Sequence, residues 1–153
     1  MKKISWAENA YKGTTVNWIK SQAEINKMLT DVGITQTRFT NMEDRLILEF
    51  VAKLTEKSIP RSVRIVIPLS TRPTDEPKTR NKELNHLHRI LFFHLKSKFV
   101  AIVNGLAEFE QEFMSHLVIM DKEGRSSTLG EKILPQYRKN LEGGEMPQFL
   151  LGN

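Results

Sequence analysis

The sequence predicts an α+β fold: a two-layer sandwich with a three- to four-stranded, mainly antiparallel sheet packed on one long helix, and a small helical C-terminal appendage. Three observations favour it. The stretch from Lys78 to Leu117 has no proline and repeats apolar residues at helical spacing. Alternating apolar residues precede it between residues 34 and 69. A chain of 153 residues is also long enough to bury a core without a metal or a disulfide.

The chain is expected to begin with an arm and a short strand. Residues 1–13 show no clear period, and we interpret them as an arm that packs through Trp6 and Tyr11. Residues 14–19 (TTVNWI) alternate and are rich in β-branched and aromatic side chains, which indicates a strand.

A helix and three further strands should follow. The capping-box pattern SQAE opens a helix that we place near residues 22–32, with Gly33 at its end. Residues 34–40 and 45–53 read as a hairpin, and residues 61–69 (RSVRIVIPL) give the strongest strand signal in the chain. Because Pro68 lacks an N–H, this last strand is expected at a sheet edge or to end there.

The long helix should bury one apolar stripe, and Gly105 should bend or break it. A glycine inside a helix costs about 1 kcal/mol relative to alanine, so we expect a second helix over residues 106–115. The stripe consists of Leu84, Leu87, Leu91, Leu95, Ile102, Leu106, Phe109 and Phe113.

The C-terminal part is expected to hold a turn, a helix and a tail. The capping box Thr128-Leu129-Gly130-Glu131 predicts a helix to about Lys139, although Pro135 lies inside it. We therefore assign one domain to residues 1–139 and a tail to residues 140–153. The apolar residues of the tail form an expected docking segment for its own fold or a neighbour: Met146, Phe149, Leu150 and Leu151.

Composition excludes several classes of protein. There is no cysteine, which rules out disulfides, thiolate catalysis and cysteine-based zinc sites and suits a reducing cytoplasm. The residues after Ile4 are too polar for a signal peptide, and no apolar stretch reaches the length of a membrane span. We expect a cytoplasmic protein with no membrane partner.

Charge is distributed unevenly. Residues 1–104 carry 18 basic and 10 acidic side chains, a net charge of +8, whereas residues 105–153 carry 5 and 8, a net charge of −3. A basic surface attracts polyanions, among which nucleic acid is abundant. The alternative is a basic surface that only promotes solubility.

The best candidate site is the junction between the last strand and the long helix. If these elements meet, their basic side chains and the helix N-terminus form one anion-attracting surface. Arg80 and Arg89 lie about 180° apart on an ideal helix, so at least one should pair with a local acid such as Glu76 or Glu83. The candidate nucleic-acid-binding residues are Arg61, Arg64, Arg72, Lys78, Arg80, Lys82 and Arg89.

No enzymatic motif is present. The spacing of His86, His88 and His94 scatters them around a helix, so we expect no metal or cofactor, and His88 is better explained as a buried, hydrogen-bonded core histidine. Glu108 and Glu112 share a helix face and could form a two-metal set with Glu49, but carboxylates on a charged helix usually face water. No phosphate loop or nucleophile elbow occurs. We expect a non-enzymatic protein.

Three groups of residues carry a resemblance. They are Tyr11, Lys12, Thr14 and Thr15 with Lys20, Ser21, residues 23–29 and Gly33; Ile65–Leu69 with Arg80 and Arg89; and Phe109, Glu110, Phe113, Leu117, Asp121, Gly124 and Thr128. With these residues the chain resembles a family of uncharacterised proteins of tailed bacteriophages and prophages, encoded in the early or replication region. The resemblance covers most of the chain, although Phe92-Phe93 stands where the family tends to have tryptophan. It implies a phage origin and the host cytoplasm, without a known activity.

The leading hypothesis is an accessory protein that binds DNA or RNA through phosphate contacts, without reading sequence. One alternative is a protein that binds a host protein or forms a homo-oligomer through its apolar tail. The other is a pocket for a small nucleotide signal, with Arg61, Arg64 and Arg80 on the phosphates.

Overall fold

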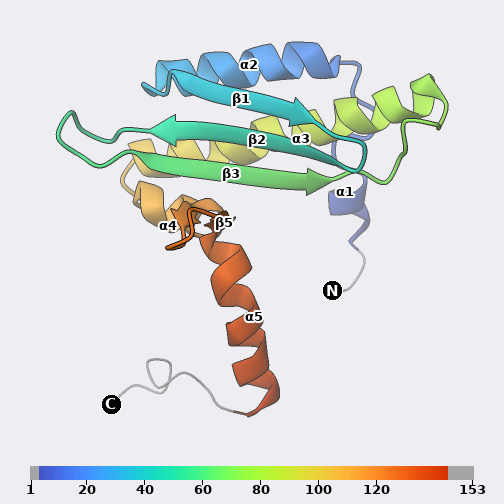
Figure 1. Cartoon of the computed structure of the whole chain (residues 1–153). Helices are drawn as coiled ribbons and strands as arrows, with labels where there is room; N and C mark the ends of the chain where they lie inside the picture. Colours follow the sequence, from blue (N-terminus) through green and yellow to red (C-terminus); the bar gives the residue numbers. More distant parts are fainter. Residues whose placement is uncertain (1–3, 145–153) are drawn as a thin grey trace.

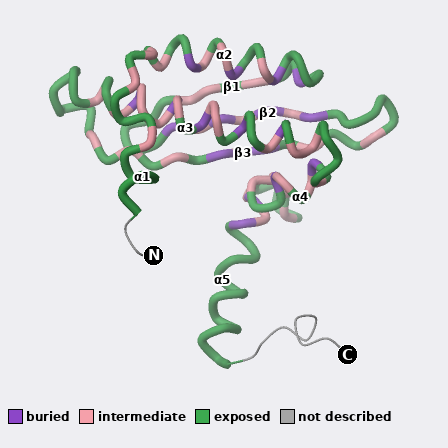
Figure 2. Tube along the Cα trace, turned by 180° about the vertical axis from the view of Figure 1, so that it is seen from behind, coloured by how far each residue is buried: buried purple, intermediate pink, exposed green. Residues whose placement is uncertain are grey.

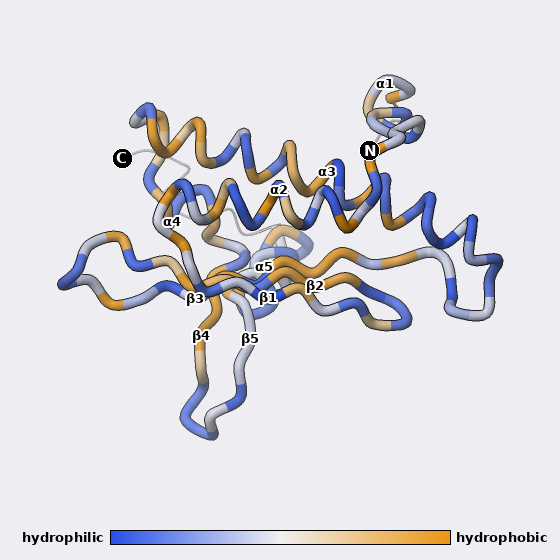
Figure 3. The backbone as a smooth tube through the Cα atoms, turned by 90° about the horizontal axis from the view of Figure 1, so that it is seen from above, coloured by the Kyte–Doolittle hydropathy of each residue, from blue (hydrophilic) through white to orange (hydrophobic). Residues whose placement is uncertain are grey.

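The computed structural model describes residues 4–144 and confirms the two-layer α+β architecture. A three-stranded antiparallel sheet of order β1-β2-β3 forms one layer, and helices α2 and α3 cover one of its faces (Figures 1 and 3). The elements are α1 (Ser5–Glu8), α2 (Trp18–Asp31), β1 (Gln36–Asn41), β2 (Arg45–Ala52), β3 (Arg61–Pro68), α3 (Pro77–Val103), α4 (Phe109–Phe113), the 3-10 helix η1 (Met114–His116), β4 (Val118–Met120), β5 (Ser126–Thr128) and α5 (Leu129–Glu142).

The core lies between the sheet and the helices. Burial alternates along strand β2, so its even-numbered residues lie under α2 and α3 and its odd-numbered residues lie on the other face. Figure 2 shows buried segments along β2 and β3. Phe50 pairs with Val63 of β3 and packs edge-on against Phe113, with ring centroids 5.6 Å apart. The predicted hairpin is confirmed, and β3, which contains Pro68, lies at an edge of the sheet as predicted.

The predicted strand over residues 14–19 is wrong. Asn17 is the N-cap of α2 and accepts a hydrogen bond from the N–H of Ile19 at 2.8 Å, while the N–H of Trp18 donates to Asn85 of α3. A side-chain cap together with a tertiary contact overrides the strand propensity of this segment. The helix therefore begins at Trp18, and Ser21 is a buried interior residue rather than a cap.

Of the two predicted outcomes at Gly105, a bend or a break, the structure shows a break. Helix α3 ends at Val103, and Gly105 has φ +73°, a conformation that favours glycine. The next helix is shorter than predicted, because α4 begins only after Glu108 closes a capping box with Gln111. Leu106 falls in the intervening turn and is 80% exposed, so its predicted place in the buried stripe is wrong.

The C-terminal elements attach to the edge of β3. Strands β4 and β5 form a small hairpin, and Leu117 makes a single bridge to Val63. The predicted capping box of Thr128 and Glu131 opens α5, which points away from the sheet (Figure 1). The helix extends past the predicted limit at Lys139 to Glu142.

Gly130 allows the first turn of α5 to lie against η1. A Cβ atom at Gly130 would be 2.7 Å from the carbonyl oxygen of Ser115. Only a residue without a side chain permits this approach.

The N-terminal arm packs through only one of its two aromatic residues. The ring of Tyr11 stacks on Phe93 of α3, with centroids 4.7 Å apart and planes within 9°. Trp6 of α1 is 77% exposed, so the prediction that it anchors the arm is wrong. Figure 3 shows α1 on the far side of α3 from the sheet.

Candidate nucleic-acid interface

The outer face of α3 carries a row of lysines. Leu84, Leu91 and Leu95 fix the buried side of this helix. Lys96 follows Lys78 by 18 residues, or five helical turns, so both lie on the same side of the helix, about 27 Å apart along the axis. Lys82 lies one turn after Lys78, and all three are exposed. We call Lys78, Lys82 and Lys96 the lysine row.

Arg89 lies between Lys82 and Lys96 along this helix, but its guanidinium is bound by other side chains of the protein. Its guanidinium forms an ion pair with Glu24 of α2, and its Cζ atom lies 4.4 Å from the ring centroid of Phe92 and 5.0 Å from that of Phe93. Only 15% of the side chain is exposed. Arg89 therefore joins α2 to α3, and its partner is not the local acid that the sequence suggested.

Arg80 and Arg72 lie near the start of α3 and differ in role. The guanidinium of Arg80 donates to the backbone carbonyls of Met42, Glu43 and Thr71 at 3.0 to 3.2 Å, which ties the β1–β2 turn to the β3–α3 loop. Arg72 is exposed in that loop, where its backbone N–H donates to Asp75.

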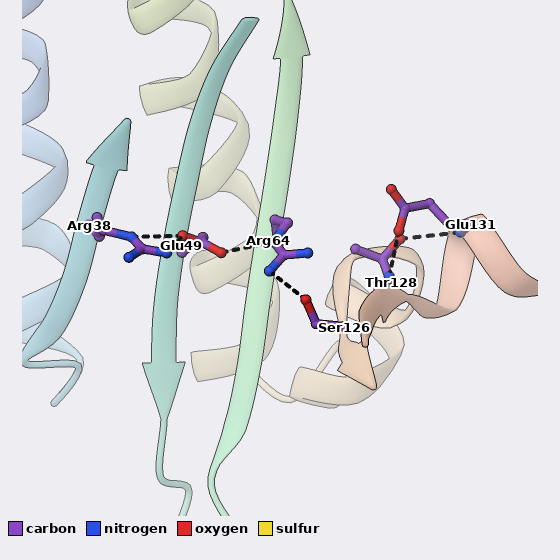
Figure 4. A network of polar contacts seen from close by, with 6 residues as sticks. All are labelled: Arg38, Glu49, Arg64, Ser126, Thr128 and Glu131. Atoms are coloured by element: carbon purple, nitrogen blue, oxygen red, sulfur yellow. Dashed lines mark hydrogen bonds and ion pairs between the residues drawn. The ribbon is translucent and has the colours of Figure 1, made fainter. Parts of the chain in front are cut away.

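Arg61 and Arg64 lie away from the start of α3. Strand β3 runs toward α3 and rises about 3.3 Å per residue, so Arg61 is at its distant end, where it pairs with Glu110 at 2.9 Å. Arg64 pairs with Glu49 at 2.8 Å and donates to Ser126 at 3.1 Å (Figure 4). The seven predicted basic residues do not form one surface.

The open face of the sheet carries an ion network that the sequence did not reveal. Glu49 on β2 lies between Arg38 of β1 and Arg64 of β3, because the three residues are in register (Figure 4). Burial would raise the pKa of Glu49, but the two arginines outweigh it and lower that pKa. A groove of about 500 Å³ runs beside this network.

Three acids of the helical layer are engaged by other groups. Glu24 pairs with Arg89, and Asp31 pairs with Lys27 at 2.8 Å. Glu83 accepts hydrogen bonds from the backbone N–H and the hydroxyl of both Ser70 and Thr71. Partial burial would raise the pKa of Glu83, but these bonds outweigh it and lower the pKa to about 2. Within residues 4–144, no acidic side chain pairs with the lysine row.

The small-nucleotide hypothesis loses its geometric basis. Arg61, Arg64 and Arg80 are held by Glu110, Glu49 and backbone carbonyls respectively, at three separate places. They do not converge on one pocket.

His88 is the buried core histidine that the sequence predicted. Its ring is fully buried between the carbonyl of Leu84, at 2.7 Å from Nδ1, and Gln22, at 2.9 Å from Nε2. Burial lowers its pKa more than the hydrogen bond to Leu84 raises it. His86 contacts the carbonyl of Ala10 at 2.8 Å and so holds the N-terminal arm.

The carboxylates considered for a two-metal site do not assemble. Glu49 lies on the open face of the sheet, Glu108 caps α4, and Glu112 pairs with Lys98 of α3 at 3.1 Å. In the part of the chain from residue 4 to 144, no three histidine, aspartate or glutamate side chains are grouped to hold a metal ion.

Helix α5 has an exposed apolar stripe that the sequence analysis missed, although its spacing was visible. Ile133, Leu134, Tyr137 and Leu141 fall at intervals of one, three and four residues and are each 41% to 51% exposed. The sequence pattern instead predicts a docking segment in the tail. Met146, Phe149, Leu150 and Leu151 lie outside the described residues.

Comparisons with family models, curated proteins and solved structures find no match for this chain. The resemblance to phage proteins therefore stays a prediction. None of the described helices is long and apolar enough to cross a membrane.

Proposed function

We propose that this protein binds nucleic acid through phosphate contacts on the outer face of α3. The lysine row carries this proposal. Its three ammonium groups lie along one side of a single helix, and no acidic side chain of residues 4–144 forms an ion pair with them, so the row keeps a positive potential. A line of cations about 27 Å long suits a nucleic-acid backbone better than one small anion.

The proposal is narrower than the sequence-based hypothesis. Arg61, Arg64, Arg80 and Arg89 stabilise the fold through their internal partners, whereas Lys78 and Lys82 retain a binding role and Lys96 joins them. Arg72, exposed in the loop that leads into α3, extends this surface.

A salt titration of binding tests the proposal. Fluorescence anisotropy with a labelled 16-nucleotide single strand measures affinity from low to moderate salt for the wild type and for the triple variant Lys78→Gln, Lys82→Gln, Lys96→Gln. For single strands, each lost phosphate contact reduces the steepness of the plot of log K against log[salt] by about 0.7. The slope of the triple variant should therefore be less steep than that of the wild type by about 2.

A matched control variant distinguishes an effect of the lysine row from an effect of reduced net charge. The triple variant Lys53→Gln, Lys57→Gln, Lys122→Gln removes the same charge from exposed residues in the β2–β3 loop and the β4–β5 turn. It should keep the wild-type slope. Equal losses in both variants, or no binding by the wild type at low salt, would refute the proposal.

A second candidate function, association of two copies, is favoured by α5. An isolated 14-residue helix is marginal in water, yet α5 contacts the body mainly at its first turn and leaves its apolar stripe uncovered. Because the helix projects clear of the sheet, the same stripe of a second copy can lie along it about a two-fold axis (Figure 1).

Sedimentation as a function of concentration tests this association. The stripe is about 12 Å long, so the contact should be smaller than a standard interface and the dimer weak. Tyr137→Ser with Leu141→Ser should abolish the dimer, whereas Arg138→Ser on the flank of the stripe should not. A wild-type monomer at all concentrations would rule it out.

A further inference from the structure

The stack of Tyr11 on Phe93 lies within the lysine row. Phe93 is three residues before Lys96 and eleven residues after Lys82, and Lys12 follows Tyr11 in the chain. Arg89 contacts Phe93 from the side of α2. An aromatic cluster therefore separates the cations at the two ends of the row.

The Tyr11 ring is stacked on one face and partly exposed. Phe93 covers that face in a nearly parallel stack, and 42% of Tyr11 remains exposed. The backbone of Tyr11 has φ +61°, the only positive φ of a non-glycine residue between residues 4 and 144. The contact of His86 with the carbonyl of Ala10 holds the neighbouring residue in place. These contacts hold the arm against α3 in the absence of a ligand.

We propose that the α3 surface selects single-stranded over double-stranded nucleic acid, with an unpaired base stacking on the face of Tyr11 opposite Phe93. This inference rests on the function proposed above. Lysines on both sides of the ring contact the phosphates that flank the stacked base. Aromatic platforms within a basic track bind single strands in this way, because every base has a π-face. A duplex keeps its bases stacked inside and offers only phosphates to the row.

Trp6 supplies a second aromatic surface on the same arm. It precedes Tyr11 by five residues and is 77% exposed, whereas Trp18 packs beside His88 with centroids 5.7 Å apart. Quenching of Trp6 fluorescence is expected with single strands and not with duplexes, and the Trp6→Phe variant should remove that signal.

Two substitutions of Tyr11 separate stacking from packing. Tyr11→Phe keeps the aromatic face, whereas Tyr11→Leu keeps an apolar contact with Phe93 but has no face for a base. Anisotropy is measured with a 16-nucleotide DNA strand, an RNA strand of the same sequence and the DNA duplex. Thermal unfolding of both variants checks that they are folded.

We expect the wild type to bind at least one of the two single strands more tightly than the duplex. Tyr11→Leu should lose about fivefold or more in affinity for that strand, while Tyr11→Phe keeps it and both variants keep the duplex affinity. Equal binding of strand and duplex, or an equal loss on both with Tyr11→Leu, would overturn this inference and leave phosphate binding intact. Absence of binding to all three ligands would overturn both proposals.

Discussion

Glu83 is expected to stabilise the connection between β3 and α3 in a pH-dependent way. Its carboxylate accepts four hydrogen bonds from Ser70 and Thr71, and its pKa falls from 4.5 to about 2. This difference corresponds to about 3.4 kcal/mol. Because Glu83 is only partly buried, solvent screening reduces the contribution to about 1–2 kcal/mol. The substitution Glu83→Gln should therefore destabilise the protein by about that amount at pH 7.

The pH dependence follows from the direction of the shift. The folded-state pKa lies below the unfolded one, so the contribution is complete well above pH 4.5 and is lost as the pH falls toward 2. The stability difference between wild type and Glu83→Gln should fall at pH 3 to less than half of its value at pH 7.

Urea unfolding at several pH values measures this difference. Glu56→Gln, in the exposed β2–β3 loop, is the control and should leave stability within about 0.5 kcal/mol. An equal loss of stability in Glu83→Gln at pH 7 and pH 3, or no loss at pH 7, would show that the four hydrogen bonds of the carboxylate do not stabilise the β3–α3 connection.

Two further predictions concern packing and are measured by urea unfolding at pH 7. Phe113→Ala should lower the free energy of unfolding by about 3–5 kcal/mol, because the ring is fully buried against Phe50, Phe99 and Phe109. Leu106→Ala in the exposed turn should lower it by less than about 0.5 kcal/mol. Similar losses in the two variants would contradict the core described above. Gly130→Ala should lower the free energy of unfolding by about 1–3 kcal/mol, because the added Cβ would clash with the Ser115 carbonyl. Gly143→Ala should be tolerated, because the nearest atom to its added Cβ would be 3.5 Å away. An unchanged stability of Gly130→Ala would show that α5 can shift freely.

The sequence predicted the parts of the fold that local patterns determine. Alternation located the three strands of the main sheet, and the Thr128–Glu131 capping box located the start of α5. It failed at residues 14–19, because the cap at Asn17 is reinforced by Asn85, 67 residues from Trp18 in the chain. Propensity carries no information about such a distant partner.

The candidate site was only partly predictable for the same reason. Charge counts identified the basic region, but whether a cation faces solvent depends on acids that are remote in sequence. Arg89 pairs with Glu24 across 65 residues, and Arg61 pairs with Glu110 across 49. The position of Tyr11 over α3 also required the tertiary structure, because the arm has no periodic pattern.

The contacts of Arg80 bear on where the chain tolerates added sequence. One guanidinium holds the carbonyls of Met42 and Glu43 in the β1–β2 turn and that of Thr71 before α3. Extra residues in that turn would pull its carbonyls away from the guanidinium, whereas the exposed stretch from residue 53 to 57 lies at the opposite end of β2. A reporter peptide or a pair of new termini therefore belongs in the β2–β3 connection, where it leaves the approach to α3 unchanged.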